Sequence, residues 1–180
     1  LSGGSPEQTV LADSPAYGLA LSPDGRYLPF LRDGDLWLRD ETTGELVQAT
    51  KIARPKIGNS PLNTCCGAGF SRPDVEVSSY SWSPDSKYLA LRIDHQSQVR
   101  RILIPDYRGE STKVEPVRRD FPGDNDHVQD LALFSVSEGR VWRLNLPDNA
   151  DRSVASFAWS PSGDRLLIDH FPQSAEHRWI

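Results

Sequence analysis

The stretch Trp82-Ser83-Pro84-Asp85-Ser86-Lys87-Tyr88-Leu89-Ala90-Leu91 decides the fold class of this 180-residue chain. Pro84 presets φ for the second position of a tight turn, and the Asp85 side chain can bond back to the backbone to close it. Aromatic and aliphatic residues on both sides of the turn are typical of β-strands. We therefore predict a hairpin, with one strand ending at Trp82 and the next beginning at Tyr88.

The same serine–proline turn occurs three times, so the hairpin is one copy of a repeat. The other copies are Ser22-Pro23-Asp24-Gly25 and Ser160-Pro161-Ser162-Gly163, each followed by an apolar strand. Asp33-Gly34 and Thr43-Gly44 indicate further tight turns after the first copy. Short strands that recur without helical periodicity predict an all-β fold, a partial β-propeller of about three four-stranded antiparallel blades.

The expected domain organisation is a loose lead-in at residues 1–14 and a partial propeller at residues 15–180. The propeller's expected parts are three blade-like units and one long loop: 15–50, 75–118 and 128–180, and 51–74. A propeller ring closes with about four to eight blades, and each blade buries its apolar face only against its neighbours. Because the chain also lacks methionine, we expect it to be a piece of a larger ring rather than one of several copies that complete each other.

Composition and charge exclude several classes of function. The net charge of −5 gives no electrostatic reason to expect nucleic acid or an anionic membrane as partner. No apolar run approaches the roughly 18 residues of a membrane span. No signal peptide is visible, but a missing N-terminus would hide one, so the compartment stays open, with the periplasm and secretion included.

Metal and redox chemistry find little support in the sequence. The histidines lie far apart without ligand spacing, so we expect no metal site and no cofactor; they are His95, His127, His170 and His177. Cys65 and Cys66 are the only cysteines. Because a bridge between adjacent cysteines is strained, we expect both to be free thiols in a loop.

Several motifs, taken in chain order, resemble those of one enzyme family. They are Ser22-Pro23-Asp24-Gly25, Asp35-Leu36-Trp37, Tyr80-Ser81-Trp82-Ser83-Pro84-Asp85, Ile104-Pro105-Asp106-Tyr107 and Phe121-Pro122-Gly123. From Ala16 onward the chain thereby resembles the N-terminal propeller of dipeptidyl peptidase IV-like serine peptidases, members of the prolyl oligopeptidase family. The second serine–proline copy together with the last two motifs carries most of the resemblance, because the turn alone occurs in many propellers.

The resemblance implies a larger parent enzyme. In this family the propeller caps a C-terminal α/β-hydrolase domain with a Ser-Asp-His triad, and the two domains remove dipeptides from peptide N-termini. The propeller admits the substrate and holds its free amine. The partners implied are therefore a peptide substrate and a hydrolase domain, and a homo-oligomer is left open.

A catalytic serine is not expected in this chain. An α/β-hydrolase places its nucleophile in a Gly-x-Ser-x-Gly elbow between a strand and a helix. The nearest match, Gly58-Asn59-Ser60-Pro61-Leu62, lacks the second glycine and a following helix. We therefore assign no catalytic residue and expect the chain alone not to hydrolyse peptides.

Asp74 and Glu76 are the candidate substrate-binding residues. The family usually has two adjacent glutamates shortly before the Tyr-Ser-Trp copy of the turn, where paired carboxylates hold the substrate ammonium through charge-assisted hydrogen bonds. Here the region reads Arg72-Pro73-Asp74-Val75-Glu76-Val77-Ser78-Ser79, without such a pair. Residues two apart on a strand share a face, so Asp74 and Glu76 can replace it. The alternative is a solvated pair that leads into a strand.

Together these patterns predict a non-catalytic propeller fragment of a dipeptidyl peptidase IV-like serine exopeptidase. Its role would be to gate and orient peptide N-termini for a hydrolase domain that this chain does not contain. The alternative from another class is a stand-alone β-propeller module that recognises a protein partner.

Overall fold

The computed structural model describes residues 20–53, 74–107, 110–119, 121–147, 152–172 and 178–180. Every helix or strand assigned among these residues is a strand, which confirms the predicted all-β class. The strands are β1 Tyr27–Arg32, β2 Asp35–Asp40, β3 Leu46–Gln48, β4 Val75–Trp82, β5 Tyr88–His95, β6 Arg101–Asp106, β7 Lys113–Arg118, β8 Val128–Ser135, β9 Arg140–Arg143, β10 Arg152–Trp159 and β11 Leu166–Pro172.

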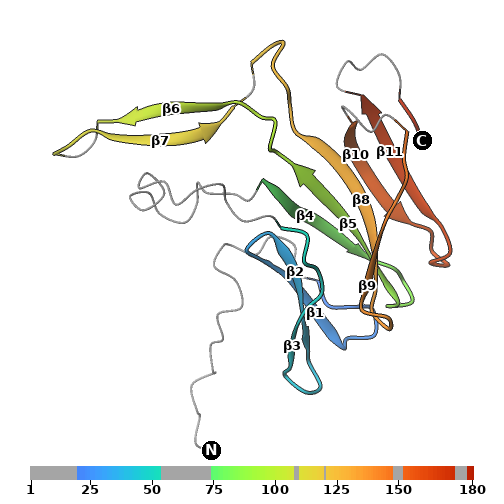
Figure 1. Cartoon of the computed structure of the whole chain (residues 1–180). Coiled ribbons are helices and arrows are strands. Elements are labelled where there is room, and N and C mark those ends of the chain that lie inside the picture. The colour runs from blue at the N-terminus through green and yellow to red at the C-terminus, as the bar shows by residue number, and fades with distance from the viewer. Residues whose placement is uncertain (1–19, 54–73, 108–109, 120, 148–151, 173–177) are drawn as a thin grey trace, which may run out of the picture.

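The strands form three stacked sheets and a separate hairpin. The first sheet has the order β1-β2-β3, the central sheet β4-β5-β8-β9, and the third sheet β10-β11. β2 lies against β4, and β10 lies against β4 and β8, so the central sheet lies between the other two (Figure 1). The β6–β7 hairpin projects away from the sheets, and we call it the arm (Figure 1). Small antiparallel sheets that stack in chain order are the architecture of a β-propeller.

Strand membership in the second and third units differs from the expectation. The second unit was expected to span residues 75–118, but β6 and β7 within that range form the separate arm, whereas β5 pairs with β8, and β8 and β9 complete the central sheet. The physical reason is burial, because β8 contributes Leu131 and Phe134 to the core, whereas Leu103 of β6 is exposed. The arm is thus an insertion between β5 and β8, which pair with each other. Consecutive strands usually pair, and β5 and β6 are an exception to this rule.

Other expected features lie outside the described residues. They are the lead-in at 1–14, residues 15–19 at the start of the first blade-like unit, most of the loop at 51–74, and the cysteines Cys65 and Cys66. The first sheet is therefore described with three of its four expected strands.

The three serine–proline turns share one geometry, as predicted for copies of a repeat. In each turn the serine N–H donates to the carbonyl five residues later, from Ser22 to Tyr27, Ser83 to Tyr88 and Ser160 to Arg165, at 2.8, 2.8 and 2.9 Å. The fourth turn residue has a positive φ in all three, with 75° at Gly25, 61° at Ser86 and 76° at Gly163. Glycine adopts this conformation freely. Serine does so at a cost, and the Ser86 hydroxyl accepts the N–H of Asp24 in the neighbouring turn at 3.0 Å.

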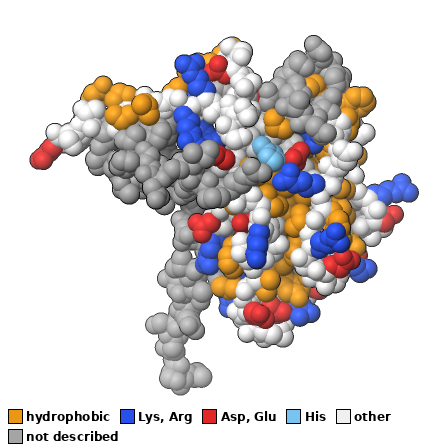
Figure 2. Space-filling view, in the orientation of Figure 1, with side chains coloured by type: hydrophobic (Ala, Val, Ile, Leu, Met, Phe, Trp, Pro, Cys, Tyr) orange, Lys and Arg blue, Asp and Glu red, His pale blue; other side chains and the backbone are white. Residues whose placement is uncertain are grey.

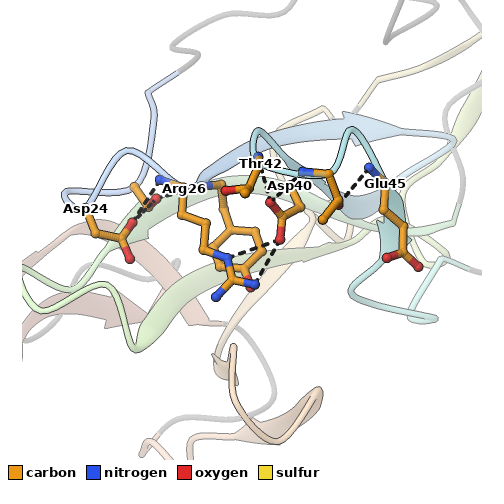
Figure 3. Close-up of polar contacts among 8 residues, drawn as sticks. Asp24, Arg26, Asp40, Thr42 and Glu45 are labelled. Carbon is orange, nitrogen blue, oxygen red and sulfur yellow. Dashed lines mark hydrogen bonds and ion pairs between the residues drawn. The ribbon is translucent and has the colours of Figure 1, made fainter.

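Polar contacts join the turns of the first sheet (Figure 3). Asp24 accepts the N–H of Arg26 at 3.1 Å, and the Arg26 guanidinium donates two bonds to Asp40 at 3.0 and 3.1 Å. Asp40 also accepts the N–H of Thr42 at 2.8 Å. The Thr42 bond is the main cause that lowers the pKa of Asp40, and the Arg26 bond lowers it further. Asp40 therefore links the serine–proline turn to the turn after β2.

Indole N–H groups connect each sheet to the preceding one. Trp82 Nε1 donates to the carbonyl of Ala20 at 3.3 Å, and Trp159 Nε1 donates to the carbonyl of Ser81 at 3.1 Å. Both tryptophans directly precede a turn serine, and both acceptors lie two residues before the turn serine of the preceding sheet. The same bond at both interfaces indicates that the sheets stack with the same offset.

The variant Trp159→Phe keeps an aromatic ring but removes the donor of one of these bonds. We expect the free energy of unfolding to fall by about 1 kcal/mol, the net value of one hydrogen bond. Trp142→Phe, on the edge strand β9, is the control and should change it by less than about 0.5 kcal/mol. Urea unfolding of both variants measures the difference, and equal losses would contradict a bond that links the sheets.

Candidate functional site at the polar end of the sheets

Buried and half-buried charged and polar groups gather at the end of the sheets opposite the serine–proline turns. The start of β4 pairs with the end of β5, which pairs with the start of β8, and β10 begins beside them. We call this region the polar end, defined by Asp74, Glu76, Asp94, His95, Gln96, Gln129, Asp130 and Arg152. Because a buried charge is costly unless it is paired, the partners of these side chains decide what the region can do.

Asp74, a predicted site residue, is buried and bound by two arginines. Arg101 Nη2 lies 3.1 Å from Asp74 Oδ1, and Arg118 Nη2 donates to the same oxygen. Burial lowers the pKa of Arg118. Because Arg101 begins β6 and Arg118 ends β7, Asp74 anchors the base of the arm to the start of β4.

Glu76, the other predicted site residue, is also buried, and it shares a neighbour with Asp74. Gln96 donates its side-chain amide to Glu76 Oε1 at 3.0 Å and its backbone N–H to the Asp74 carbonyl at 2.7 Å. The structure thus brings the two candidates together at the end of β5. The alternative of a solvated surface pair is wrong, because both residues are buried. Their role in substrate binding stays a prediction.

A line of hydrogen bonds crosses four strands beside these carboxylates. Ser78 of β4 donates to Asp94 Oδ1 of β5 at 2.9 Å, and Gln129 of β8 donates to the same oxygen at 3.2 Å. Gln129 Oε1 in turn accepts the N–H of Val154 in β10 at 2.8 Å. This line was not predicted from the sequence. Its available signal was a polar pair, Gln129-Asp130, at the start of a strand that is otherwise apolar.

β4 and β10, the strands that run from the polar end to a serine–proline turn, each carry a β-bulge at the same repeat position. The registers shift between Val77 and Ser79 in β4 and between Val154 and Ser156 in β10. The bulged residues, Ser78 and Ala155, each lie five residues before the turn serine. A bulge redirects the side chains on one side of it, so the repeat itself sets how the polar end is oriented relative to the core.

Arg152 is fully buried and holds the second charged cluster of the polar end. It donates to Asp130 Oδ1 at 3.0 Å and to the carbonyls of Leu146 and Pro147 at 3.0 and 2.9 Å. On the other side of the carboxylate, His95 Nε2 lies 2.9 Å from Asp130 Oδ2. Asp130 therefore connects β5, β8 and the start of β10.

Asp130 should contribute a pH-dependent part of the stability. The close approach of the His95 imidazole is the main cause that lowers the pKa of Asp130, and the charges of Arg152 and Arg143 lower it further. A carboxyl with a folded pKa below its unfolded value of about 3.9 adds stability above that pH and loses it as the pH falls through the folded pKa. We expect the free energy of unfolding to fall less steeply below about pH 4 in Asp130→Asn than in the wild type. Urea unfolding along an acid pH series measures both slopes, and parallel slopes would contradict this role.

The remaining candidate chemistry is limited to what the described residues show. Within those parts of the chain, no group of three or more His, Cys, Asp or Glu side chains is placed to hold a metal ion. The described parts of the chain contain no helix with the length and apolar character needed to cross a bilayer. The stretch at 58–62, nearest to a nucleophile motif, lies outside the described residues.

Stacked antiparallel sheets that each carry a serine–proline turn of the same geometry define the chain as a β-propeller region. The family model described as "Dipeptidyl peptidase IV (DPP IV) N-terminal region" matches residues 4–172. The chain therefore belongs to this family, and it corresponds to the N-terminal region of a dipeptidyl peptidase IV-like peptidase.

Named relatives agree with this family. "Probable dipeptidyl-aminopeptidase B" of Metarhizium robertsii is 25% identical over 171 residues, which cover 82% of this chain and 17% of the relative. The protein of the same name from Aspergillus niger is 26% identical over 169 residues, 81% of this chain and 18% of its own. The crystal structure of Porphyromonas gingivalis dipeptidyl peptidase 4 shares the fold, with a TM-score of 0.67, 21% identity, and coverage of 86% of this chain and 22% of that one. The chain thus spans less than a fifth of these curated relatives.

Proposed function

We propose that this chain is the non-catalytic propeller part of a dipeptidyl peptidase IV-like serine exopeptidase. In this proposal it gates and orients peptide N-termini for an α/β-hydrolase domain elsewhere in the same protein. The observation that carries the proposal is the family match over residues 4–172. The Glu76 carboxylate at the polar end supports it, because a carboxylate can accept a charge-assisted hydrogen bond from a peptide ammonium.

Within this proposal, Glu76 binds the peptide ammonium, and Asp74 fixes the base of the arm through its two arginine partners. Asp74 accepts bonds from two guanidinium groups, which balance its charge and fix the base of the arm. Glu76 lies two residues further, on the same face, and its Oε1 accepts a hydrogen bond from the Gln96 side-chain amide. A carboxylate in that position can accept a charge-assisted hydrogen bond from an ammonium.

The variant Glu76→Gln in the full-length protein tests this assignment. We expect KM for a dipeptidyl substrate to rise by about 10- to 100-fold with kcat nearly unchanged, the loss of one charge-assisted bond. The control is Glu45→Gln, at an exposed position just after the Thr43-Gly44 turn, and it should leave KM and kcat unchanged. An unchanged KM for Glu76→Gln would overturn the assignment of Glu76 but not the peptidase proposal.

The arm is the part of the chain that we propose for a homo-oligomer contact. Leu103, Ile104 and Tyr107 are exposed on it, and Figure 2 shows hydrophobic side chains gathered over this hairpin. A two-stranded hairpin also leaves backbone groups unpaired along its edges. The mass of the full-length protein and of its Leu103→Asp variant in solution tests this: a dimer that the variant dissociates supports it, and an unchanged mass contradicts it.

The proposed function itself is tested by dipeptide release. The full-length protein should cleave a dipeptidyl chromogenic substrate such as Gly-Pro-p-nitroanilide, or another member of a panel of such substrates. The 180-residue chain alone should show no turnover. Turnover by the chain alone would overturn its non-catalytic role. No turnover by the full-length protein on any member of the panel would favour a protein-recognition module instead.

A further inference from the structure

Gln96, the first residue after β5, has a backbone that is held on both sides. Its N–H donates to the carbonyl of Asp74 at 2.7 Å. Its carbonyl accepts the N–H of Val99 at 3.1 Å and a hydrogen bond from Arg118, which ends β7 at the base of the arm. These three partners fix the point from which the Gln96 side chain extends.

The side chain of Gln96 donates to the Glu76 carboxylate. Gln96 Nε2 lies 3.0 Å from Glu76 Oε1. Gln96 is half-buried and Glu76 is buried, so this hydrogen bond is largely removed from water. A hydrogen bond to a charged acceptor is short and strong. Because its donor starts from a fixed backbone, this bond gives the Glu76 carboxylate a defined orientation.

A second carboxylate lies directly opposite Glu76, which makes this orientation important. Asp94 is the register partner of Glu76 in β5, and it is buried as well. Like charges directly opposite each other on paired strands repel. Asp94 Oδ1 accepts hydrogen bonds from Ser78 at 2.9 Å and from Gln129 at 3.2 Å. Each carboxylate therefore has donors of its own, and the bond from Gln96 holds Glu76 in place against the repulsion.

We infer that Gln96 is a positioning residue for the ammonium site. It fixes the Glu76 carboxylate through its side-chain amide and does not itself bind the ammonium. Because this role acts through Glu76, it rests on the proposed function, in which Glu76 binds the peptide terminus. Loss of the Gln96 amide should therefore weaken substrate binding only while the carboxylate at position 76 is present.

A double-mutant cycle in the full-length protein tests this role. Gln96→Met keeps a side chain of similar length but removes the donor. We expect KM for a dipeptidyl substrate to rise by about 3- to 10-fold with kcat nearly unchanged. The double variant Gln96→Met/Glu76→Gln should have the KM of Glu76→Gln to within about twofold, because no carboxylate is left for Gln96 to orient.

Gln48→Met is the matched control. Gln48 Nε2 donates to Asp35 Oδ2 at 3.3 Å, and Asp35 is buried like Glu76, but it belongs to the first sheet and has no proposed contact with substrate. Gln48→Met and Gln96→Met should lower the midpoint of thermal unfolding by amounts that agree within about 2 °C. Only Gln96→Met should raise KM.

The outcomes separate this role from the proposed function. If Glu76→Gln raises KM and Gln96→Met does not, the positioning role is wrong and the proposed function stands. If Gln96→Met raises KM equally with and without the carboxylate at position 76, Gln96 acts by another route and the role is also wrong. If Glu76→Gln leaves KM unchanged, the assignment of Glu76 fails, and the role of Gln96 fails with it.

A second variant keeps the test decisive if Gln96→Met does not fold. Gln96→Asn keeps the amide but shortens the side chain by one methylene, so the amide no longer reaches Glu76. It should give the same rise in KM, and an unchanged KM would overturn the positioning role.

Discussion

Replacing Arg152 by methionine is expected to lower the free energy of unfolding by about 3–5 kcal/mol, the usual loss when one partner of a buried ion pair is removed. The guanidinium is fully buried and donates to Asp130 and to the carbonyls of Leu146 and Pro147. Methionine fills part of the volume but donates no hydrogen bond. The variant therefore leaves the Asp130 carboxylate without its buried cation and the two carbonyls without this donor.

The matched control for Arg152 is Arg143, which approaches the same carboxylate. Arg143 Nη1 lies 3.8 Å from Asp130 Oδ2, and its side chain is 56% exposed. Arg143→Met should therefore cost less than about 1 kcal/mol, as exposed ion pairs do. Urea unfolding at neutral pH measures both variants. Similar losses of unfolding free energy in the two variants would contradict a larger contribution from the buried Arg152.

The second large effect is expected from Asp74→Ala, at about 3 kcal/mol. The variant leaves the guanidiniums of Arg101 and Arg118 beside each other without the carboxylate that separates them. Their repulsion should open the base of the arm before the sheets unfold. The N–H of Arg119, which donates to the Arg100 carbonyl at 3.0 Å, should then exchange with solvent faster than the core amides do.

Asp85→Ala is the control for Asp74→Ala. Asp85 accepts the Ser83 hydroxyl at 2.7 Å and pairs with Lys87 at 3.1 Å, but it lies in an exposed turn at the other end of the sheet. Its removal should cost about 1 kcal/mol and leave exchange at the arm base unchanged. Faster exchange at Arg119 in both variants would indicate general destabilisation and contradict an anchor at Asp74.

The local elements of the fold were predictable because short-range chemistry decides them. The serine–proline turns need a preset φ, a side chain that bonds to the backbone and a residue with positive φ. The sequence shows the first two features in all three turns, and it shows a glycine for the third at Gly25 and Gly163 but not at Ser86. The hairpin turn between β1 and β2 was also predictable, because Asp33 and Gly34 form a sequence typical of such turns and both have a positive φ, 54° and 82°. Strand pairing across the arm was not predictable in this way, because β5 and β8 are joined by long-range packing.

The candidate site was predictable only in part, for the same reason. Asp74 and Glu76 were found from their spacing before a strand. Their burial was missed because the arginines that bind Asp74 lie 27 and 44 residues away in the sequence. The cluster around Arg152 was also missed, because its aspartate partner is 22 residues away and its other acceptors are backbone carbonyls.

The central physical account is a stack of sheets whose turns lie side by side in chain order. The Asp24 N–H donates to the Ser86 hydroxyl, and a Cβ at Gly163 would lie 3.4 Å from Pro84 Cδ, so the second turn contacts both of the others. Spin labels at the exposed turn prolines, with both cysteines replaced by serine, allow this order to be measured by electron paramagnetic resonance. The account predicts that the pairs 23/84 and 84/161 are both closer than the pair 23/161. A 23/161 distance equal to or shorter than the other two would contradict it.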